Sequence, residues 1–198
     1  MLLQSGFILA LGYFGTWVWA QASDRDIAVH VERDGNAFAV AAELTVAATA
    51  DEVRAVPTDC DHMAQILANV DASRITSRDG NTFEVTQRSH ATAGVLRFSQ
   101  DSVRQVELSR KREIRSHLLK GDLKASDFTT RIAEESGGVR ITVRGKFVAG
   151  GLVASAITTD AVETQTRRQY QELRDEILRR KAGPPPRLIA RNCNPAPG

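Results

Sequence analysis

The stretch ATADEVRAVPTDCDHMAQILANVDASRITSRDGNTFEVTQR, residues 48–88, decides the fold, because its pattern changes within it from helical spacing to strand alternation. Thr49 is expected to cap a short helix, since two acidic residues follow in the first turn and Pro57 ends the apolar spacing. A second short helix is expected over residues 59–69, and strand alternation begins near Ser73. The stretch therefore predicts two short helices set between strands.

Apolar and polar residues alternate just before this stretch, from Phe38 to Val46, as in a half-buried strand. Residues 27–33 are expected to form an earlier strand. Asp34-Gly35 suits the tight turn between the two, because both central positions of such a turn can take positive φ. The domain is therefore expected to begin with a β-hairpin.

A long β region is expected after the two helices, from Ser73 to Phe147. Turns at Asp79-Gly80, Gly121-Asp122 and Gly137-Gly138 divide it into short segments of alternating residues. Short strands separated by such turns are typical of an antiparallel sheet.

The last regular element is expected to be one long helix over residues 155–181, which contain no Gly or Pro and are rich in Gln, Glu and Arg. At 1.5 Å per residue, such a helix is about 40 Å long. Its buried face is expected to carry Val162, Thr166, Tyr170, Leu173 and Ile177. Its arginines, Arg174 among them, are expected to lie largely off that face.

This order of elements predicts an α+β fold, in which a curved antiparallel sheet wraps around the long C-terminal helix and two short helices follow an early strand. The sequence also resembles a known family over residues 48–88, over FSQDSVRQVELSRKREIRSHLLKGDLKASDFTTRIAEESGGVRITVRGKF (98–147) and over ETQTRRQYQELRDEILRR (163–180). The telling motifs are the Thr58-Asp59 step, the Gly121-Asp122 corner and the Glu-Ile-Leu-Arg-Arg ending. Together they resemble the START-like, or SRPBCC, superfamily of polyketide cyclases/dehydratases and coenzyme-Q-binding proteins. The resemblance implies the helix-grip fold of START-like and Bet v1-like proteins.

Composition excludes several function classes. The 198 residues include 26 Lys+Arg and 24 Asp+Glu, a net charge of +2, and the two signs are interspersed, which argues against a nucleic-acid partner. The two cysteines and four histidines form neither a C-x-x-C pair nor an H-E-x-x-H motif, so no metal site is expected. No cofactor is expected either.

The N-terminal residues 1–22 are predicted to be a secretory signal peptide. No charged residue precedes Asp24, the run before it is almost wholly apolar, and Ala20-Gln21-Ala22 fits cleavage after Ala22. The protein would then be periplasmic or secreted. The alternative is a membrane anchor, because the segment lacks Lys and Arg at its start and about 20 apolar residues span a bilayer.

The predicted START-like domain occupies residues 23–182, and a Pro-rich tail occupies 183–198. Export would permit a disulfide between Cys60 and Cys193, because an oxidising compartment allows thiols to pair. Two unpaired thiols remain the alternative.

The inward-facing residues of the predicted sheet and helix suggest a lipophilic ligand site, because apolar walls give affinity and a few hydroxyls fix orientation. The candidate ligand-binding residues are Phe83, Val85, Leu96, Phe98, Ile114, Ser116, Leu118, Phe128, Thr130, Ile141, Val143, Phe147, Val162, Thr166 and Tyr170. The leading hypothesis is an exported domain that binds or carries a hydrophobic small molecule, such as a lipid, a quinone or a polyketide-like compound. The alternative reading of the same residues is a filled core without a cavity.

The sequence gives no positive evidence for catalysis, since it contains no Ser-His-Asp order, Gly-rich phosphate loop or paired-carboxylate motif. Tyr170 and His117 are weak catalytic candidates. Strand alternation directs His117 outward. His90 is expected to be exposed near a strand end or in a loop, and Asp122 to be a turn residue that caps its own backbone. The resemblance nevertheless implies a cyclase/dehydratase enzyme as an alternative. A ligand-free interaction module of the cell envelope is a third.

A basic run comprises Arg110, Lys111, Arg112 and Arg115. Such a run could make transient contact with anionic lipid headgroups during ligand pickup. The simpler interpretation is a solvated hairpin.

Overall fold

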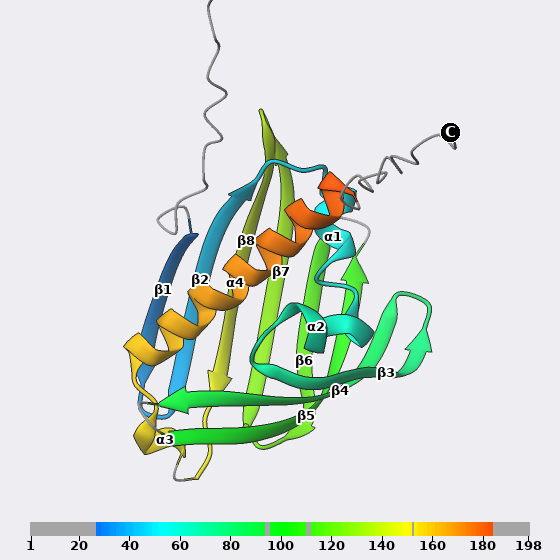
Figure 1. The fold of residues 1–198 in the computed structure, drawn as a ribbon. Helices are drawn as coiled ribbons and strands as arrows, with labels where there is room; N and C mark the ends of the chain where they lie inside the picture. Colours follow the sequence, from blue (N-terminus) through cyan, green and yellow to red (C-terminus); the bar gives the residue numbers. More distant parts are fainter. Residues whose placement is uncertain (1–26, 94–95, 110–111, 152, 184–198) are drawn as a thin grey trace, which may run out of the picture.

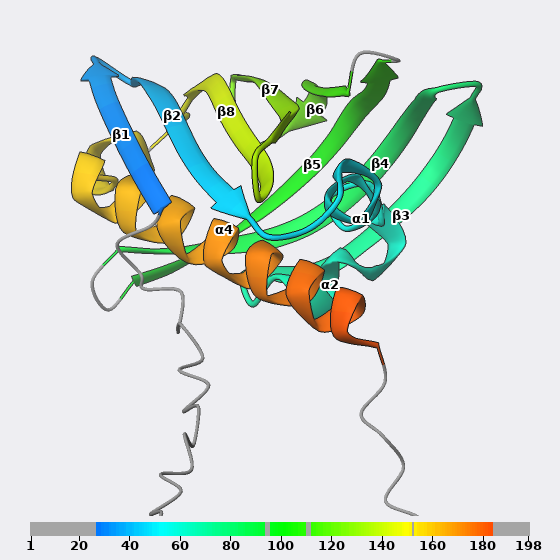
Figure 2. The same ribbon diagram turned by 90° about the horizontal axis from the view of Figure 1, so that it is seen from above.

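One sheet of eight antiparallel strands curls around a long C-terminal helix, α4 (Figures 1 and 2). The structure is a computed structural model that describes residues 27–93, 96–109, 112–151 and 153–183. The strands are β1 (Ile27–Asp34), β2 (Ala37–Val46), β3 (Val70–Asp79), β4 (Thr82–Ala93), β5 (Leu96–Ser109), β6 (Glu113–Gly121), β7 (Ala125–Glu135) and β8 (Gly138–Val148). The helices are α1 (Ala50–Ala55), η2 (Cys60–His62), α2 (Met63–Ile66), α3 (Val153–Ala156) and α4 (Thr159–Ala182). This is the α+β architecture predicted from the sequence.

The strand order is β1-β2-β8-β7-β6-β5-β4-β3, so the first hairpin joins the last strand through β2. Phe38 of β2 pairs with Phe147 of β8, and their rings stack with centroids 4.9 Å apart. The predicted hairpin between β1 and β2 is present, but its turn is centred on Gly35-Asn36, one residue later than expected. Gly35 supplies the positive φ, 58°, that this turn requires.

Helix α1 begins as the sequence predicts. The Thr49 hydroxyl accepts a hydrogen bond from the Glu52 backbone N–H at 3.3 Å, and the Glu52 carboxylate accepts one from the Thr49 N–H at 2.8 Å. These bonds lower the pKa of Glu52 below its ordinary value. Together they form a capping box, which satisfies two backbone donors at the helix start.

The single helix predicted over residues 59–69 is wrong. A short 3₁₀ turn, η2, precedes the four-residue α2, and the chain is extended again at Leu67. The acidic residues of this segment bond elsewhere: the Asp61 carboxylate accepts from the Ile75 N–H at 2.7 Å, and Asp59 accepts from Arg180 at 2.8 Å. Side chains that make such tertiary bonds favour an irregular backbone over a continuous helix.

The predicted C-terminal helix over residues 155–181 is also interrupted. Helix α3 ends at Ala156, and α4 begins after Thr158, whose hydroxyl accepts from the Ala161 N–H at 3.2 Å. The Arg33 guanidinium donates to the carbonyls of Ala154 and Ile157, both at 2.9 Å. The interruption between α3 and α4 is therefore stabilised by a residue of β1, which the spacing of residues within the helix does not reveal.

The expectation that Arg174 lies off the buried face is wrong. Thr166 and Ile177 are buried as predicted, but Arg174 is only 2% exposed. Its Nη2 donates to Gln171 at 2.6 Å, while its Nε has no hydrogen-bond partner among the described residues. The sheet curls around α4 and covers a broader face than the narrow apolar stripe indicates (Figure 2).

One end of the interior is filled by packed aliphatic side chains. We call this the filled region, and it consists of Ile27, Leu44, Val46, Val53, Val139, Ile141 and Ile177, each at most 6% exposed. Next to it, Arg180 near the end of α4 binds Asp59, and the Lys181 ammonium donates to the Ala47 carbonyl. These bonds fix the C-terminal half of α4 against the α1 end of the sheet.

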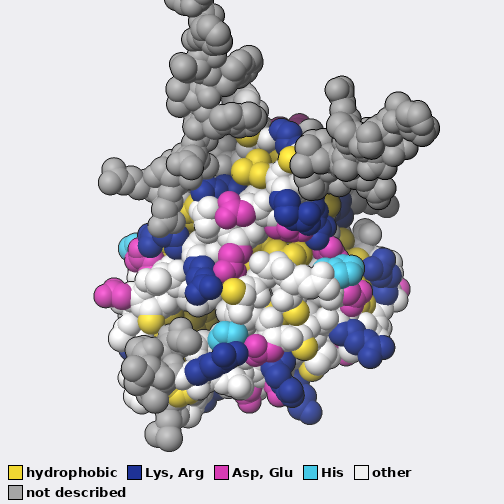
Figure 3. Space-filling view, in the orientation of Figure 1, with side chains coloured by type: hydrophobic (Ala, Val, Ile, Leu, Met, Phe, Trp, Pro, Cys, Tyr) yellow, Lys and Arg dark blue, Asp and Glu magenta, His cyan; other side chains and the backbone are white. Residues whose placement is uncertain are grey.

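Charges of both signs are interspersed on the face shown in Figure 3, as the near-neutral composition predicts. In the basic run, Arg112 pairs with Glu134 at 2.5 Å and Arg115 pairs with Glu113 at 2.7 Å. Arg110 and Lys111 lie outside the described residues.

The predicted signal peptide at 1–22 lies outside the described residues, as does the predicted tail at 183–198 apart from Gly183, and with it Cys193. Cys60 is a buried thiol without a disulfide in the structure, and burial raises its pKa to about 11, with Asp61 and Asp59 adding to the effect. The Cys60–Cys193 bridge therefore stays a prediction. No helix within the described ranges is long and apolar enough to span a membrane.

Candidate ligand-binding site

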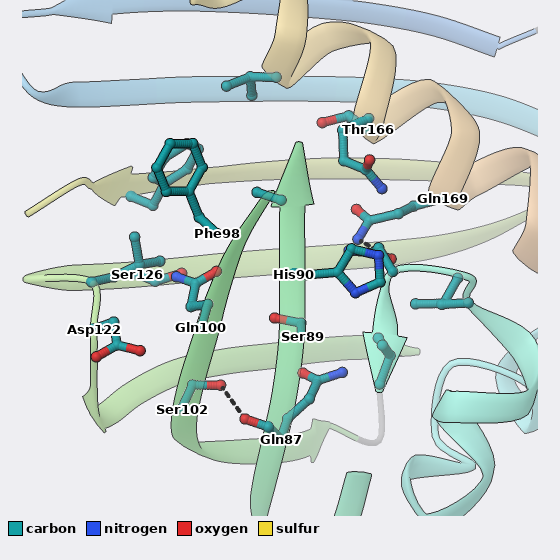
Figure 4. Close-up of a pocket in the computed structure, with 18 of the residues that line it drawn as sticks. Gln87, Ser89, His90, Phe98, Gln100, Ser102, Asp122, Ser126, Thr166 and Gln169 are labelled. Atoms are coloured by element: carbon teal, nitrogen blue, oxygen red, sulfur yellow. Dashed lines mark hydrogen bonds between the residues drawn. The ribbon is translucent and has the colours of Figure 1, made fainter. Parts of the chain in front are cut away.

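A cavity of about 400 Å³ lies between the inner face of the sheet and α4, at the end opposite the filled region (Figure 4). Its volume is within the range of about 300–1,000 Å³ that small-molecule sites occupy. The apolar residues that line it are Val40, Leu67, Val70, Ala91, Phe98, Leu123, Phe128, Phe147, Ile157, Ala161, Val162 and Leu173. The interior is therefore not packed throughout, as a filled core would require.

Polar side chains line the cavity where β4, β5 and the start of β7 meet. They are Gln87, Ser89, Gln100, Ser102, Arg104, Asp122 and Ser126. Figure 4 shows Asp122, Ser126 and Gln100 on the sheet side, across the cavity from Thr166 and Gln169 of α4. The cavity is thus amphipathic, with polar side chains from both the sheet and α4 beside its apolar residues.

Arg104 is the cationic residue of this polar wall. Its Nε donates to the Ser116 hydroxyl at 2.8 Å, and its Nη2 donates to the Ser126 hydroxyl at 3.1 Å. Burial lowers the pKa of Arg104 below its ordinary value, and only the negative charge of Asp127 opposes this effect. Among the described residues, no carboxylate forms an ion pair with Arg104.

Tyr170 is the phenol that the sequence singles out, and it lines the cavity from α4. Burial raises its pKa above the ordinary value, so the hydroxyl is neutral at physiological pH. Within the described part of the chain, no hydrogen bond to this hydroxyl is present. Gln169, one residue earlier, donates to Asn69 at 3.1 Å and ties α4 to the start of β3.

A comparison with models of known protein families gives a match that covers most of the described residues. A family model described as polyketide cyclase / dehydrase and lipid transport matches residues 37–182. The chain belongs to this family. No curated protein matches the sequence.

Solved structures place this family member among helix-grip proteins. A STAR-related lipid transfer protein from Xanthomonas axonopodis superposes with a TM-score of 0.67 at 17% identity, over 78% of this chain and 94% of that one. An aromatase/cyclase from Streptomyces superposes with a TM-score of 0.60 at 20% identity, over 74% of this chain and 98% of that one. The predicted helix-grip fold and the START-like resemblance are confirmed.

Six of the predicted ligand-binding residues line the cavity of this family member: Phe98, Phe128, Phe147, Val162, Thr166 and Tyr170. Others lie in the packed core instead, namely Phe83, Val85, Ile114, Ile141 and Val143. Leu118 is buried and Thr130 is partly buried, and neither lines the cavity. Ser116 does not line the cavity either, but its hydroxyl accepts a hydrogen bond from Arg104, which does. The Leu96 side chain lies outside what the structure describes.

Apart from Asp122, which was expected to be a turn residue, the polar wall residues were missed, although strand alternation indicates those on β4 and β5. Phe83 and Val85 face inward on β4, and the same parity continues to Gln87 and Ser89. On β5, the parity of Phe98 continues to the next three polar residues of the wall, Gln100, Ser102 and Arg104. Polar residues at inward positions of a strand are thus a readable sign of a cavity.

The two catalytic candidates, His117 and Tyr170, lie in different places relative to the cavity. His117 is 60% exposed on its side chain and pairs with Asp127, outside the cavity, whereas Tyr170 lines it. His90 lies near the end of β4, which extends to Ala93, but the expectation that it is exposed is wrong, because it lines the cavity. The His90 side chain is 15% exposed, and its Nδ1 lies 3.0 Å from an Asp71 carboxylate oxygen.

Asp122 also differs from its expected role. Its carboxylate accepts from the Asp101 N–H of β5 at 2.7 Å, so it links the turn after β6 to a neighbouring strand and does not cap its own backbone. Gly121 permits this contact, since a Cβ there would lie 2.4 Å from the Asp101 carbonyl oxygen. No three His, Cys, Asp or Glu side chains of the described ranges lie together as a metal site would need.

Proposed function

We propose that this domain binds and carries a hydrophobic small molecule, in the class of a lipid, a quinone or a polyketide-like compound, between its sheet and α4. The observation that carries the proposal is the cavity of about 400 Å³ with three phenylalanines in its wall. Removing apolar ligand surface from water in such a space contributes about 25 cal/mol per Å². Family membership supports the same class of ligand.

Native mass spectrometry of the purified full chain tests this proposal. We expect a stoichiometric apolar molecule that organic extraction releases and identifies. A protein that is recovered empty, and that stays empty after incubation with membrane lipid extract, would contradict carriage. The same spectra of a Val162→Phe variant provide the control, because added bulk in the cavity should reduce occupancy without changing the outer surface.

One observation favours an enzyme of the cyclase/dehydratase type as a second candidate. His90 lies in the cavity wall with Asp71 beside it, and an imidazole next to a carboxylate can act as a general base. The Arg97 guanidinium donates to the same Asp71 carboxylate at 3.1 Å, so this carboxylate is held beside the imidazole. Incubation with a poly-β-ketone thioester should then yield a product lighter by one water, and His90→Gln should abolish it. Unchanged substrate would leave binding as the function.

Export belongs to the proposal as well, because a carrier outside the cytoplasm fits the N-terminal segment 1–22. Intact-mass measurement after expression in a bacterial host tests it, since cleavage after Ala22 removes a defined mass. A chain retained in the membrane fraction with residues 1–22 intact would favour an anchor.

Transient contact of the basic run with anionic lipid headgroups is a separate part of the proposal. It would appear as binding of the protein to anionic lipid vesicles that weakens as the salt concentration rises.

A further inference from the structure

We infer that the ligand ends in a carboxylate and binds with that carboxylate against Arg104, while its hydrocarbon portion fills the apolar part of the cavity. The inference rests on the proposed function and names the chemical class of the ligand. It begins from a cation on the inner face of a sheet, in a cavity that also has uncharged polar side chains and an apolar part formed by three phenylalanines and neighbouring aliphatic residues.

The protein satisfies only part of the Arg104 guanidinium. This group has five N–H donors, and the hydroxyls of Ser116 and Ser126 accept from Nε and Nη2. Both acceptors are neutral, so they orient the planar group without neutralising it. Donors remain on the Nη1/Nη2 edge, which matches the two oxygens of a carboxylate.

The orientation of Arg104 is itself held by buried groups. Ser126 is 2% exposed, and Ser116 lies on the adjacent strand β6. Two hydrogen bonds to different strands fix the plane of the guanidinium before any ligand arrives. A fixed donor pair recognises a carboxylate at a lower entropic cost than a mobile side chain does.

The charge of Arg104 is also incompletely compensated. Within the described ranges, no carboxylate lies within ion-pair distance of it, whereas the surface arginines Arg88 and Arg131 each have such a partner. A charge that is withdrawn from water without a partner destabilises the empty protein. A ligand carboxylate would supply the missing counter-charge.

Other charged groups near the cavity are already engaged. Asp122 accepts from the Asp101 N–H, and Asp127 pairs with His117 outside the cavity. Of these, Asp127 is the one whose charge acts on Arg104. Its side chain is 63% exposed, so solvent screens it. Arg104 is therefore the group in the polar wall that can attract an anion.

The rest of the cavity determines the other part of the ligand. Phe98, Phe128, Phe147 and Val162 present apolar surface and no charge. A molecule that matches both parts is a single-ended amphiphile, such as a fatty acid or another long carboxylic acid. An apolar compound without an acid group would leave Arg104 uncompensated.

Calorimetric titration of the full chain with dodecanoate and with 1-dodecanol tests the inference. The two probes share a hydrocarbon chain and differ in the end group. We expect dodecanoate to bind roughly 10- to 100-fold more tightly, because hydrogen bonds to a charged acceptor are the stronger ones. Arg104→Met should remove this preference by weakening dodecanoate alone. Arg104→Lys should keep part of it, since lysine offers a point charge without the planar donor pair.

Arg131→Met is the matched control, because it removes an exposed arginine whose partner is Glu113, outside the cavity. It should leave the preference unchanged, and circular dichroism of each variant reports whether it folds. Equal binding of both probes by the wild type, or a preference that survives in Arg104→Met, overturns the carboxylate inference while hydrophobic ligand binding stands. If neither probe binds, the carboxylate inference fails, while the native mass spectra decide separately whether the domain carries another hydrophobic molecule. Should Arg104→Met not fold, the comparison of wild type with Arg104→Lys decides.

Discussion

The packed core, of which the filled region is a part, and the cavity share strands β4 and β5, yet one is packed and the other is hollow. β4 contributes Phe83 and Val85 to the packed core and Gln87 and Ser89 to the cavity wall. β5 makes the same change, from Val106 in the core to the polar wall residues further along. On each strand these core and wall residues occupy alternate positions, so the side-chain type at those positions decides whether the enclosed space is filled.

Removing a packed side chain from the filled region should have the largest effect. Ile177→Ala removes a residue that is 1% exposed on α4, and it should lower the free energy of unfolding by about 2–5 kcal/mol, since the cavity it leaves cannot collapse fully. Urea denaturation measures the change. Leu119→Ala, at a site 48% exposed, should change stability by less than about 0.5 kcal/mol. Equal losses at both sites would abolish the contrast between packed and open positions.

Gly145 marks a close contact beside the cavity. A Cβ at this position would lie 2.1 Å from the Phe128 ring, so Gly145→Ala must displace that ring, and we expect a loss of about 1–3 kcal/mol. Thermal unfolding measures it. In the double variant Gly145→Ala/Phe128→Ala, the loss should be smaller than the sum of the two single losses, because alanine removes the ring atoms that the added Cβ would meet. If the two losses of stability add in the double variant, the Gly145–Phe128 contact is not the reason that position 145 requires glycine.

Added bulk should be tolerated in the cavity. Val162→Phe should weaken binding of a hydrophobic fluorescent probe about tenfold, or about 1.4 kcal/mol, because it occupies space that the ligand needs. Its stability should stay close to that of the wild type. Leu119→Phe adds the same ring on the exposed surface and should leave binding unchanged. A large loss of stability in Val162→Phe would mean that this part of the interior is packed after all.

The smallest effect concerns the ion pairs at the end of α4. Arg179, with Arg180, lowers the pKa of Glu176 to about 2. For Asp59, burial opposes ionisation, but hydrogen bonds from His62 and Arg180 outweigh it and keep the pKa below its ordinary value. A carboxyl with a depressed pKa stabilises the fold above its unfolded-state pKa, and this contribution disappears as the pH falls towards the folded-state value.

Glu176→Gln should therefore lower stability by about 1 kcal/mol at neutral pH. The difference from the wild type should shrink as the pH falls from about 4.5 towards about 2. Chemical denaturation at a series of pH values measures this. Glu163→Gln on the same helix, at a pair with Arg167 that is about one third exposed, is the comparison variant. A pH-independent difference would assign Glu176 a packing role.

Sequence alone was sufficient for the fold because its signals are local. Thr49 with its acidic neighbours starts α1, and alternation from Phe38 to Val46 assigns the inner face of β2. The elements that were wrong depend on distant partners. The bend before α4 involves Arg33 of β1, and the shortened second helix involves Ile75 and Arg180.

The candidate site was less predictable, because the space between sheet and helix depends on curvature that spacing does not encode. Phe98 and Phe147 reach the cavity, while Phe83 with the same alternation packs in the core. Arg104 was overlooked because a charged residue on a strand usually faces solvent. Its parity with Phe98 was the available evidence that it faces inward.

Because β2 pairs with β8, the sheet cannot be completed until the last strand of the chain has been synthesised. Glu43 of β2 binds Arg140 of β8, and these residues are 97 positions apart. During synthesis, the first hairpin therefore has an unpaired strand edge until nearly the whole domain has been made. Contacts so distant in sequence slow folding, and an exposed edge invites pairing with other chains. Chains truncated before β8 should aggregate, and a protein with this topology depends on protection of its N-terminal hairpin until its last strand arrives.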